Sequence, residues 1–397
     1  MRILVCSIEA PLPPVNGLRL ALGELLEQLR GRQHVRTLAL TGADQRAADA
    51  DDATLRLLPP AQPSAVRATG RHLRSLLARR PFGVDRLSEA LREPLLEELE
   101  RFRPDVVHVT SGRAAALGRA LAGRPAVLAA LDAWHLNVEA DAAAAPAWRR
   151  PLLAMQAGFV RRFEARVYRF FSRVVVVSEA DRDALLALDP SLRIAVIPNG
   201  VDTDFFAPAS DTARDEQRLL FTGVMSYPPN VTAAEFLARE LAPLVRAARP
   251  DARLAIVGRA PAPAVRDLSR LEAVDVVGEV PDLRPWLTGS RVYVCPMQSG
   301  TGIKNKLLEA MASGLPCVAT PLALQGLQAR DGVELLVGET PEELASHVVR
   351  LLEDDELAQT LGNAARRYVC AQHDWTAVGA AYERLYETVL AERPSSS

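Results

Sequence analysis

Short apolar segments alternate with longer segments of helical periodicity along almost the whole chain, and this alternation restricts the possible folds more than any other feature. The short segments are continuous runs of Val, Leu, Ile and Ala, as expected of parallel strands that are buried on both faces of a sheet. Strands separated by helices in this order predict open α/β sheets. The candidate strands are Ile3–Ser7, Val35–Leu40, Val106–Val109, Ala126–Leu131, Val174–Val177, Ile194–Ile197, Leu219–Thr222, Arg253–Val257, Val274–Val277, Val292–Val294 and Cys317–Thr320. The candidate helices include Gly17–Leu29, Glu89–Phe102, Thr232–Ala247 and Ile303–Ser313.

The series of strands starts twice, once at Met1 and again near Arg218. Between the two series lies Ala207–Thr212, a Pro-, Ser- and Asp-containing stretch that suits a linker. A chain of 397 residues also exceeds the usual size of one domain. We therefore predict an N-terminal Rossmann-like domain over residues 1–208 and a C-terminal one over residues 215–373. In such domains ligands bind at the carboxyl ends of the strands, so site residues are expected there.

Charge and cysteine content exclude several classes of function. The formal net charge is −2, so the chain lacks the basic excess of nucleic-acid-binding proteins, and we expect no nucleic-acid partner. No apolar run approaches the roughly 20 residues that span a bilayer, and the first residues lack the pattern of a signal peptide. The four cysteines have no CxxC spacing, which argues against a structural metal site and against a disulfide framework. We expect a cytoplasmic protein.

Two charged segments allow more than one interpretation. Asp202-Thr203-Asp204 has the DxD pattern that can hold a divalent cation, but its place beside the linker favours a turn or helix cap, and we expect no metal. The arginines between Arg161 and Arg173 are interleaved with apolar residues in one predicted helix. This helix either packs by its apolar stripe or contacts an anionic membrane, which would place the protein peripherally at the inner membrane face.

The most informative segment runs from Pro296 to Gly314, after the strand Val292–Val294. Gly300 and Gly302 precede a predicted helix that starts at Ile303, so backbone N–H groups at a helix N-terminus are open to an anion. Lys304 and Lys306 stand in its first turn, where the helix dipole disfavours cations unless an anion is bound.

Lys306 and Glu309 are three residues apart and share one face of this helix. That face offers a cation for a phosphate and a carboxylate that can accept two ribose hydroxyls. The alternative is a surface ion pair between the two side chains, which contributes a few tenths of a kcal/mol. The glycines and the strand–turn–helix context favour a nucleoside diphosphate.

Several segments together resemble one family of enzymes. The stretch Pro296–Gly314 resembles the donor-binding segment of retaining GT-B glycosyltransferases, specifically glycosyltransferase family 4 (group 1), and Leu308-Glu309-Ala310-Met311-Ala312-Ser313-Gly314-Leu315-Pro316 is the most specific run. Ile197–Asp202 resembles the start of that family's second domain, and Phe221–Asn230 resembles the first loop of that domain. Gln372–Trp375 resembles the point where the closing helix returns to the first domain, which implies such a helix over residues 374–392. The chain looks similar to a subgroup of bacterial polysaccharide and natural-product sugar transferases.

The resemblance implies the GT-B fold, with two facing Rossmann-like domains and a C-terminal helix that crosses back. It also implies roles for donor-binding residues, namely Gly17, Gly223, Val280, Gly300, Thr301, Gly302, Ile303, Lys304, Lys306 and Glu309. Lys306 would counter charge on the leaving phosphate, and the backbone of Gly278-Glu279-Val280 would meet the base. The chain departs from the pattern at Thr301, where the family often has Glu, and after Gly223, where it often has Arg and Lys.

In the first domain Pro13-Pro14-Val15-Asn16-Gly17, between the first strand and the first helix, resembles the family's glycine loop, which would place Asn16 and Gly17 facing donor and acceptor; the alternative is an ordinary turn between strand and helix. Where the family often has a His after the fourth strand, this chain has Asp132, which we expect near the donor sugar as a catalytic-site residue. His135 is either an acceptor-side or a satisfied structural residue. His108 ends another strand and has the same two alternatives.

The function expected from the resemblance is hexosyl transfer from a nucleotide sugar, with UDP as the leading nucleotide, to an unknown acceptor hydroxyl. It implies retention of configuration, no essential metal and no separate cofactor, and no protein base is assigned. The alternatives are a GT-B sugar-nucleotide epimerase or phosphorylase, and a catalytically inactive nucleotide-binding partner.

Overall fold

The computed structural model describes residues 1–12, 17–41, 54–59, 75–209, 214–300 and 302–392. Contacts divide the chain into two units, Met1–Pro198 with Val378–Ser397, and Asn199–Ala377. The boundary expected at residue 208 lies beyond the division after Pro198. The reason is that Val201 belongs to the second unit, because its N–H donates to His373 O at 2.7 Å.

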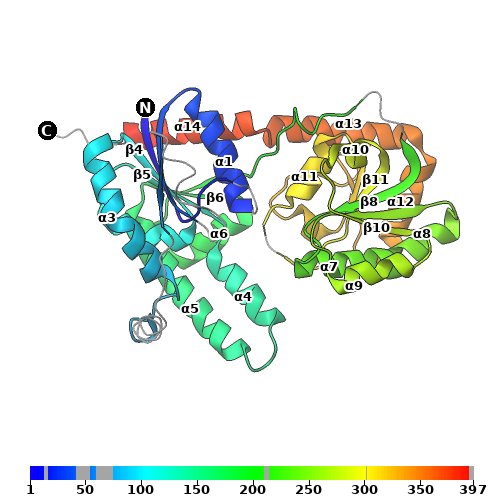
Figure 1. Cartoon of the computed structure of the whole chain (residues 1–397), viewed down its shortest axis with the longest axis horizontal. Coiled ribbons are helices and arrows are strands. Elements are labelled where there is room, and N and C mark those ends of the chain that lie inside the picture. The colour runs from blue at the N-terminus through cyan, green and yellow to red at the C-terminus, as the bar shows by residue number, and fades with distance from the viewer. Residues whose placement is uncertain (13–16, 42–53, 60–74, 210–213, 301, 393–397) are drawn as a thin grey trace. The chain divides into compact units, whose positions relative to one another are not determined.

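Unit 1 contains one parallel sheet of seven strands in the order β3-β2-β1-β4-β5-β6-β7 (Figure 1). The strands are β1 Arg2–Ser7, β2 His34–Leu40, β3 Leu55–Leu58, β4 Val106–Thr110, β5 Ala126–Leu131, β6 Arg173–Val176 and β7 Ile194–Val196. The helices are α1 Gly17–Arg30, α3 Val84–Phe102, α4 Trp134–Ala144, α5 Arg150–Val167 and α6 Glu179–Leu188, with 3₁₀ segments Gly112–Leu121 and Tyr168–Phe170.

Successive residues of β4 show how both faces of this sheet are covered, since neighbouring side chains point to opposite sides. Val107 and Val109 lie in the core that includes side chains of α3. His108 points the other way, towards Tyr386 of the C-terminal helix. The central strands are therefore buried on both faces, which is why they appear in the sequence as unbroken apolar runs.

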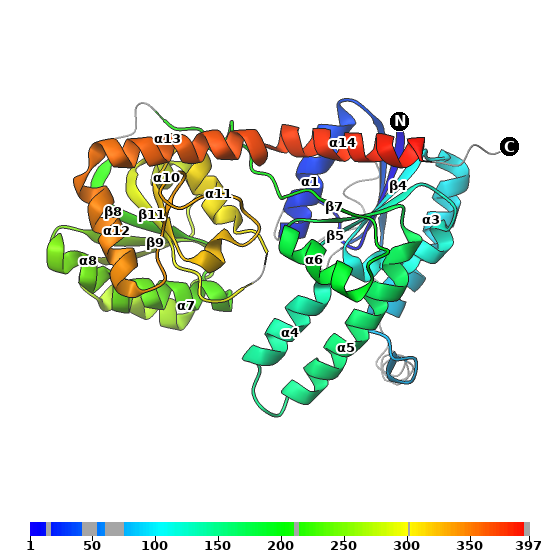
Figure 2. The same cartoon turned by 180° about the vertical axis from the view of Figure 1, so that it is seen from behind.

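Unit 2 contains a second parallel sheet, of six strands in the order β10-β9-β8-β11-β12-β13 (Figure 2). The strands are β8 Asp215–Thr222, β9 Arg253–Val257, β10 Val274–Gly278, β11 Ser290–Cys295, β12 Cys317–Ala319 and β13 Leu336–Val337. The helices are α7 Pro228–Phe236, α8 Ala242–Ala248, α9 Pro263–Arg266, α10 Arg284–Thr288, α11 Asn305–Ala312, α12 Pro341–Glu353 and α13 Asp355–Gln372, with 3₁₀ segments Asp267–Arg270 and Pro321–Leu324.

The last helix, α14 (Trp375–Ala391), confirms the expected return of the chain to the first domain. It begins in unit 2, and from Val378 onward its residues belong to unit 1. Tyr386 is fully buried, and its hydroxyl lies 2.7 Å from His108 Nδ1 of β4. The C-terminal helix thus completes the core of unit 1.

Some elements differ from expectation. The helix expected over Thr232–Ala247 is two helices, α7 and α8, joined by a π-helical turn over Leu237–Leu241. The basic stretch Arg161–Arg173 is not one helix, because α5 ends at Val167 and Arg173 begins β6. Residues 210–212 of the expected linker Ala207–Thr212 lie outside the described part of the chain.

Candidate functional site

The sheet order of unit 2 identifies where a ligand would bind. Connections run from β8 to β9 and β10 on one side and to β11, β12 and β13 on the other, so the order reverses between β8 and β11. In open parallel sheets ligands bind at the carboxyl ends of the strands, at such a switch point. The loop that starts at Gly223 follows β8, and the loop to Lys304 follows β11. The predicted donor segment therefore lies at the switch point of the second sheet.

Glycines allow the loops after β8 and β9 to pack directly against each other. Gly258 has φ +152°, and a Cβ there would lie 1.7 Å from the carbonyl oxygen of Gly223. At Gly223, where φ is +153°, a Cβ would lie 2.7 Å from Asn230 Nδ2 and 3.2 Å from Lys306 Nζ. Neither position has room for a side chain, so bare backbone forms the edge of the site here.

Helix α11 begins later than expected, at Asn305, with Lys304 as its N-cap residue. Gly300 and Gly302 have φ values of +99° and +72°, a region that favours glycine, so they form the turn before the helix. The Lys304 side chain is buried, and its Nζ donates to Gly300 O at 3.1 Å and Gly302 O at 2.6 Å. Burial lowers the pKa of Lys304 to about 8. Lys304 therefore bonds to its own loop rather than standing in the first turn, and Thr301 lies outside the described residues.

Lys306 is the cation that faces the glycine loop. Its Nζ donates to Asn230 Oδ1, lies 3.7 Å from Met297 Sδ, and stands 4.6 Å from the centre of the Phe221 ring. These neighbours are neutral, and burial lowers the pKa of the amine. Within the described residues no carboxylate forms an ion pair with Lys306, so the alternative of a surface Lys306–Glu309 pair does not describe this structure.

Glu309 stands one turn further along α11. Burial raises the pKa of its carboxyl to about 7, and the nearby charge of Lys306 opposes this increase. No hydrogen bond from its side chain to any described residue is present. The carboxylate is thus positioned on the same helix as Lys306 with its acceptor capacity unused, as a group that accepts ligand hydroxyls would be.

The remaining donor-side residues lie at the same edge of the sheet. Gly278, with φ +84°, ends β10, and its carbonyl accepts from Gly258 N at 2.7 Å. Val280 follows it and packs against the core of unit 2, as does Ile303 before α11. Their side chains therefore support the loops, and the backbone is what they can offer to a ligand.

Sequence reasoning missed Asn230 as a partner of Lys306. Asn230 belongs to α7 and is 5% exposed; its Nδ2 donates to Val224 O at 3.0 Å while its Oδ1 accepts from Lys306. It lies within the segment Phe221–Asn230 that carries the family resemblance. An amide side chain in that segment could have indicated a polar role at the site. The sequence could not show that its partner is Lys306, because the two residues are 76 positions apart.

Unit 1 has a corresponding pocket of about 290 Å³ at the carboxyl ends of β1, β4 and β5. Its sheet order reverses between β1 and β4, so this is the switch point of the first sheet. Ser111 and Leu131, which line the pocket, have φ values of +72° and +73°. Strained non-glycine backbone of this kind gathers at functional sites. The polar lining includes Glu9, Ser111, Arg113, Asp132 and Asn137.

Asp132 lines this pocket, as its expected role near a ligand requires. Burial raises the pKa of its carboxyl to about 6, a hydrogen bond from Asn137 lowers it, and the charges of Asp181 and Glu164 raise it further. Arg113 lies 5.5 Å from the centre of the Trp134 ring. Arg113 and Glu9 were missed, although both lie within three residues of the end of a central strand, where switch-point residues are expected.

The two histidines proposed for the acceptor side are buried instead. His108 is fully buried and bonded to Tyr386, and His135 is 3% exposed with Nδ1 2.6 Å from Glu164 Oε2. Glu164 also accepts from Trp134 N at 2.8 Å and so holds the start of α4. These placements correspond to the structural alternative for both residues. Gly17 begins α1, and Asn16 lies outside the described residues.

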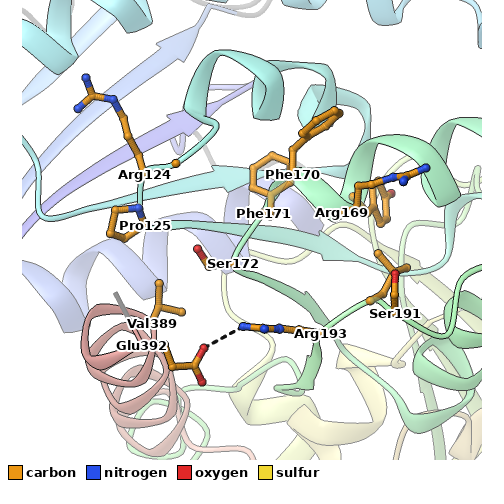
Figure 3. A pocket seen from close by; sticks show the side chains of 13 residues that line it. Arg124, Pro125, Arg169, Phe170, Phe171, Ser172, Ser191, Arg193, Val389 and Glu392 are labelled. Atoms are coloured by element: carbon orange, nitrogen blue, oxygen red, sulfur yellow. Dashed lines mark hydrogen bonds and ion pairs between the residues drawn. The ribbon is translucent and has the colours of Figure 1, made fainter. Parts of the chain in front are cut away.

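Two other features do not contribute to this site. A pocket of about 420 Å³ lies at the amino ends of β5, β6 and β7, at the opposite edge of the first sheet, where Arg193 pairs with Glu392 at 3.2 Å (Figure 3). Asp202 accepts from the N–H groups of Asp204 and Phe205 at 3.1 and 2.8 Å, so this carboxylate caps a turn. In the parts of the chain that the structure describes, no group of three or more potential metal-ligating side chains is present.

Two family models match the chain. Residues 15–205 match the model described as Glycosyltransferase Family 4, and residues 216–354 match the one described as Glycosyl transferases group 1. The first match covers the residues that line the unit 1 pocket except Ile8 and Glu9, and the second covers the glycine loops and α11.

Named relatives match part of the chain. A phosphatidyl-myo-inositol mannosyltransferase from Mycobacterium tuberculosis is 34% identical over 209 residues, which cover 49% of this chain and 53% of that protein. An MMP alpha-(1->4)-mannosyltransferase from Mycolicibacterium hassiacum is 29% identical over 265 residues, covering 64% of this chain and 62% of that protein. The chain thus matches about half the length of the first relative and less than two thirds of the second.

Solved structures match over nearly the whole chain. Sucrose-phosphate synthase from Thermosynechococcus elongatus has a TM-score of 0.73 at 18% identity and covers 98% of this chain and 99% of its own. Anabaena HepE in complex with UDP has a TM-score of 0.66 at 15% identity, with 98% and 100% covered. At these identities the similarity concerns the fold alone, and it confirms the expected GT-B class with its two Rossmann-like domains.

Proposed function

This chain belongs to glycosyltransferase family 4, the group 1 glycosyltransferases, and we propose that it transfers a hexose from a nucleoside-diphosphate sugar to an acceptor hydroxyl. We further propose UDP as the nucleotide and retention of configuration at the anomeric carbon. The named relatives transfer mannose, so mannose is among the sugars to be tested first.

The observation that carries this proposal is the setting of Lys306. A half-buried ammonium whose direct contacts are neutral, beside two glycine loops at a switch point, is stabilised when an anion binds there. A diphosphate supplies that anion, and its negative charge grows as the sugar–phosphate bond breaks. Lys306 would then stabilise the transition state more than the ground state, which is the requirement for catalysis.

Other residues complete the proposed donor site. Glu309, with its unused acceptor capacity, would hold the ribose hydroxyls, and the backbone of Gly278–Val280 would meet the base. Asp132, in the pocket of unit 1, would contact the transferred sugar. In a front-face reaction the departing phosphate takes the proton of the acceptor hydroxyl, so the proposal assigns no protein base.

Calorimetric titration with UDP, GDP, ADP and TDP tests the donor site. We expect one nucleotide to bind selectively in the micromolar range, with binding weakened at least about tenfold in Lys306→Ala and in Glu309→Ala. Arg266→Ala, an exposed charge removed elsewhere in unit 2, is the matched control and should bind normally. Normal binding by both site variants would contradict the assignment.

Activity is tested separately, with the sugar derivatives of the nucleotide that binds. Release of nucleoside diphosphate that depends on an added acceptor, with the product's anomeric configuration read by NMR, supports retaining transfer. Conversion of the nucleotide sugar without acceptor would identify an epimerase, and binding without any turnover would identify an inactive partner.

A further inference from the structure

The hairpin of α4 and α5 ends in an exposed tip, residues Pro146–Leu152, which projects from unit 1 (Figures 1 and 2). Every residue of this tip is exposed. Trp148 is 79% exposed and Leu152 is 50% exposed, although both are large and apolar. Single exposed apolar residues are common, but two large ones at one exposed tip indicate an interaction surface.

The charge around these side chains indicates the chemistry of that partner. Arg149 and Arg150 lie between Trp148 and Leu152 in the sequence, and Arg162 is exposed further along α5. Arg149 lies 5.6 Å from the centre of the Trp148 ring, and Arg150 Nε donates to Ala145 O at 2.9 Å, which fixes the turn. Helix α4 also carries two acidic residues, Glu139 and Asp141, which reduce the positive charge of the hairpin. Glu139 is paired with Arg161 at 2.6 Å.

We propose that the tip Pro146–Leu152 binds to the surface of a membrane that contains anionic lipids. Trp and Leu side chains enter the boundary between headgroups and acyl chains, while the arginines pair with lipid phosphates. Two apolar side chains alone give only weak partitioning, so the arginines make anionic lipid a requirement. Among the described residues no helix has the length and apolar character to cross a bilayer, which is consistent with contact at the surface.

This surface differs from the basic stretch Arg161–Arg173 that the sequence suggested. In that stretch Arg161 is paired with Glu139, and Arg173 is paired with Glu392. The proposal does not depend on the catalytic activity of the protein, because the tip contributes no residue to either switch-point site.

The test measures binding of the full chain to vesicles. Phosphatidylcholine vesicles are compared with vesicles that contain phosphatidylglycerol in addition, by sedimentation at low and high salt. We expect roughly tenfold stronger binding to the anionic vesicles, reduced by salt. The Trp148→Ser/Leu152→Ser and Arg149→Ala/Arg150→Ala variants should each weaken it roughly tenfold. Matched controls in unit 2, Leu244→Ser and Arg266→Ala/Arg270→Ala, should bind like the unchanged protein.

Fluorescence gives a second readout. Of the four tryptophans only Trp148 is exposed, whereas Trp134 and Trp286 are half-buried and Trp375 is buried, so a blue shift of the emission on vesicle binding should come mainly from Trp148. The shift should vanish in Trp148→Leu, which keeps an apolar side chain and should still bind. Absence of binding to anionic vesicles, or equal binding by the tip variants, overturns the proposal. Light scattering that shows a dimer dependent on Trp148, without vesicle binding, would assign the tip to a second copy of the chain instead.

Discussion

Of the 47 lysine and arginine residues in this chain, only Lys304 and Lys306 are lysines. The two are not equivalent in the fold. Lys304 is bonded to the carbonyls of its own loop, whereas Lys306 stands among neutral groups beside Gly223. A lysine amine is a compact charge whose pKa responds to burial, unlike that of arginine, which suits Lys306 to a site where an anion comes and goes.

Because the chain has only two lysines, Lys306 can be observed directly by NMR. Reductive methylation with ¹³C-formaldehyde should give only two lysine signals in addition to that of the N-terminus. We expect addition of the bound nucleotide to raise the pKa of Lys306, because a nearby anion favours the charged amine. The Lys304 signal should titrate near pH 8 and change less on nucleotide addition. A shift confined to Lys304 would contradict the assigned roles.

Asn230 positions Lys306 and is tested by two substitutions. Asn230→Ala removes the acceptor for Lys306 Nζ and should weaken nucleotide binding roughly tenfold. Asn230→Asp keeps the shape but supplies a carboxylate that neutralises Lys306, so it should weaken binding further. Calorimetry measures both, and Asn363→Asp on the exposed side of α13 is the control. Because Asp also loses the bond from Nδ2 to Val224 O, urea unfolding of each variant is measured alongside binding; a loss of stability with unchanged nucleotide binding would show a purely structural role.

Ionisation of Glu309 should have opposite effects on the stability of the protein and on nucleotide binding. Its folded pKa of about 7 lies above its ordinary value of 4.5, so ionisation destabilises the native state as pH rises from 4.5 to 7, and the penalty stays constant above that. Glu309→Gln should therefore increase the free energy of unfolding by about 1–3 kcal/mol at pH 8 and change it little near pH 4. Urea unfolding at both pH values measures this.

Nucleotide binding should follow the ionised form of Glu309, since the carboxylate is the better acceptor for ribose hydroxyls. Affinity should increase as pH rises through about 7, and the Gln variant should lose this dependence. Equal pH profiles for the two proteins would exclude Glu309 from the site.

At the level of elements, the loops after β8 and β9 depend on backbone contact at Gly258. A methyl group there would meet Gly223 O at 1.7 Å, and a φ of +152° is itself unfavourable for alanine. Gly258→Ala should destabilise the protein by about 2–4 kcal/mol and also weaken nucleotide binding.

The matched control for this loop is Gly158→Ala in the middle of α5. The position is open, with no atom within 4 Å of an added Cβ, so alanine should stabilise the helix by about 0.5–1 kcal/mol. Thermal unfolding of both variants separates the effect of close backbone approach from the general effect of replacing glycine.

At the level of the whole molecule, the division into units predicts that binding of the nucleotide belongs to unit 2 alone. Tyr386→Ala removes a fully buried side chain from unit 1 and should destabilise that unit by about 3–5 kcal/mol. Below its lowered melting temperature this variant should bind nucleotide normally, because every donor-side residue in unit 2 is untouched. Glu387→Ala, an exposed neighbour on α14, is the control, and equal loss of nucleotide binding and stability in Tyr386→Ala would show that the units are coupled.

Much of this protein followed from local sequence. Unbroken apolar runs predicted the parallel sheets, because a strand buried on both faces needs an apolar residue at every position. Gly300 and Gly302 before a helical pattern predicted the turn before α11, and the spacing of Lys306 and Glu309 placed them on one face. These features depend on neighbours within a few residues, so they could be predicted without knowledge of the fold.

Contacts between distant segments were decided only by the tertiary structure. Lys304 donates to the carbonyls of its own loop, and Lys306 donates to Asn230, from which it is separated by 76 residues in the sequence. His108 is buried against Tyr386, which lies 278 residues further along the chain. The sequence alone does not distinguish a polar side chain at the end of a strand that faces a ligand from one that is hydrogen-bonded inside the protein. Which of the two holds depends on what the fold packs against it, and that is set by the sheet order and by the returning helix.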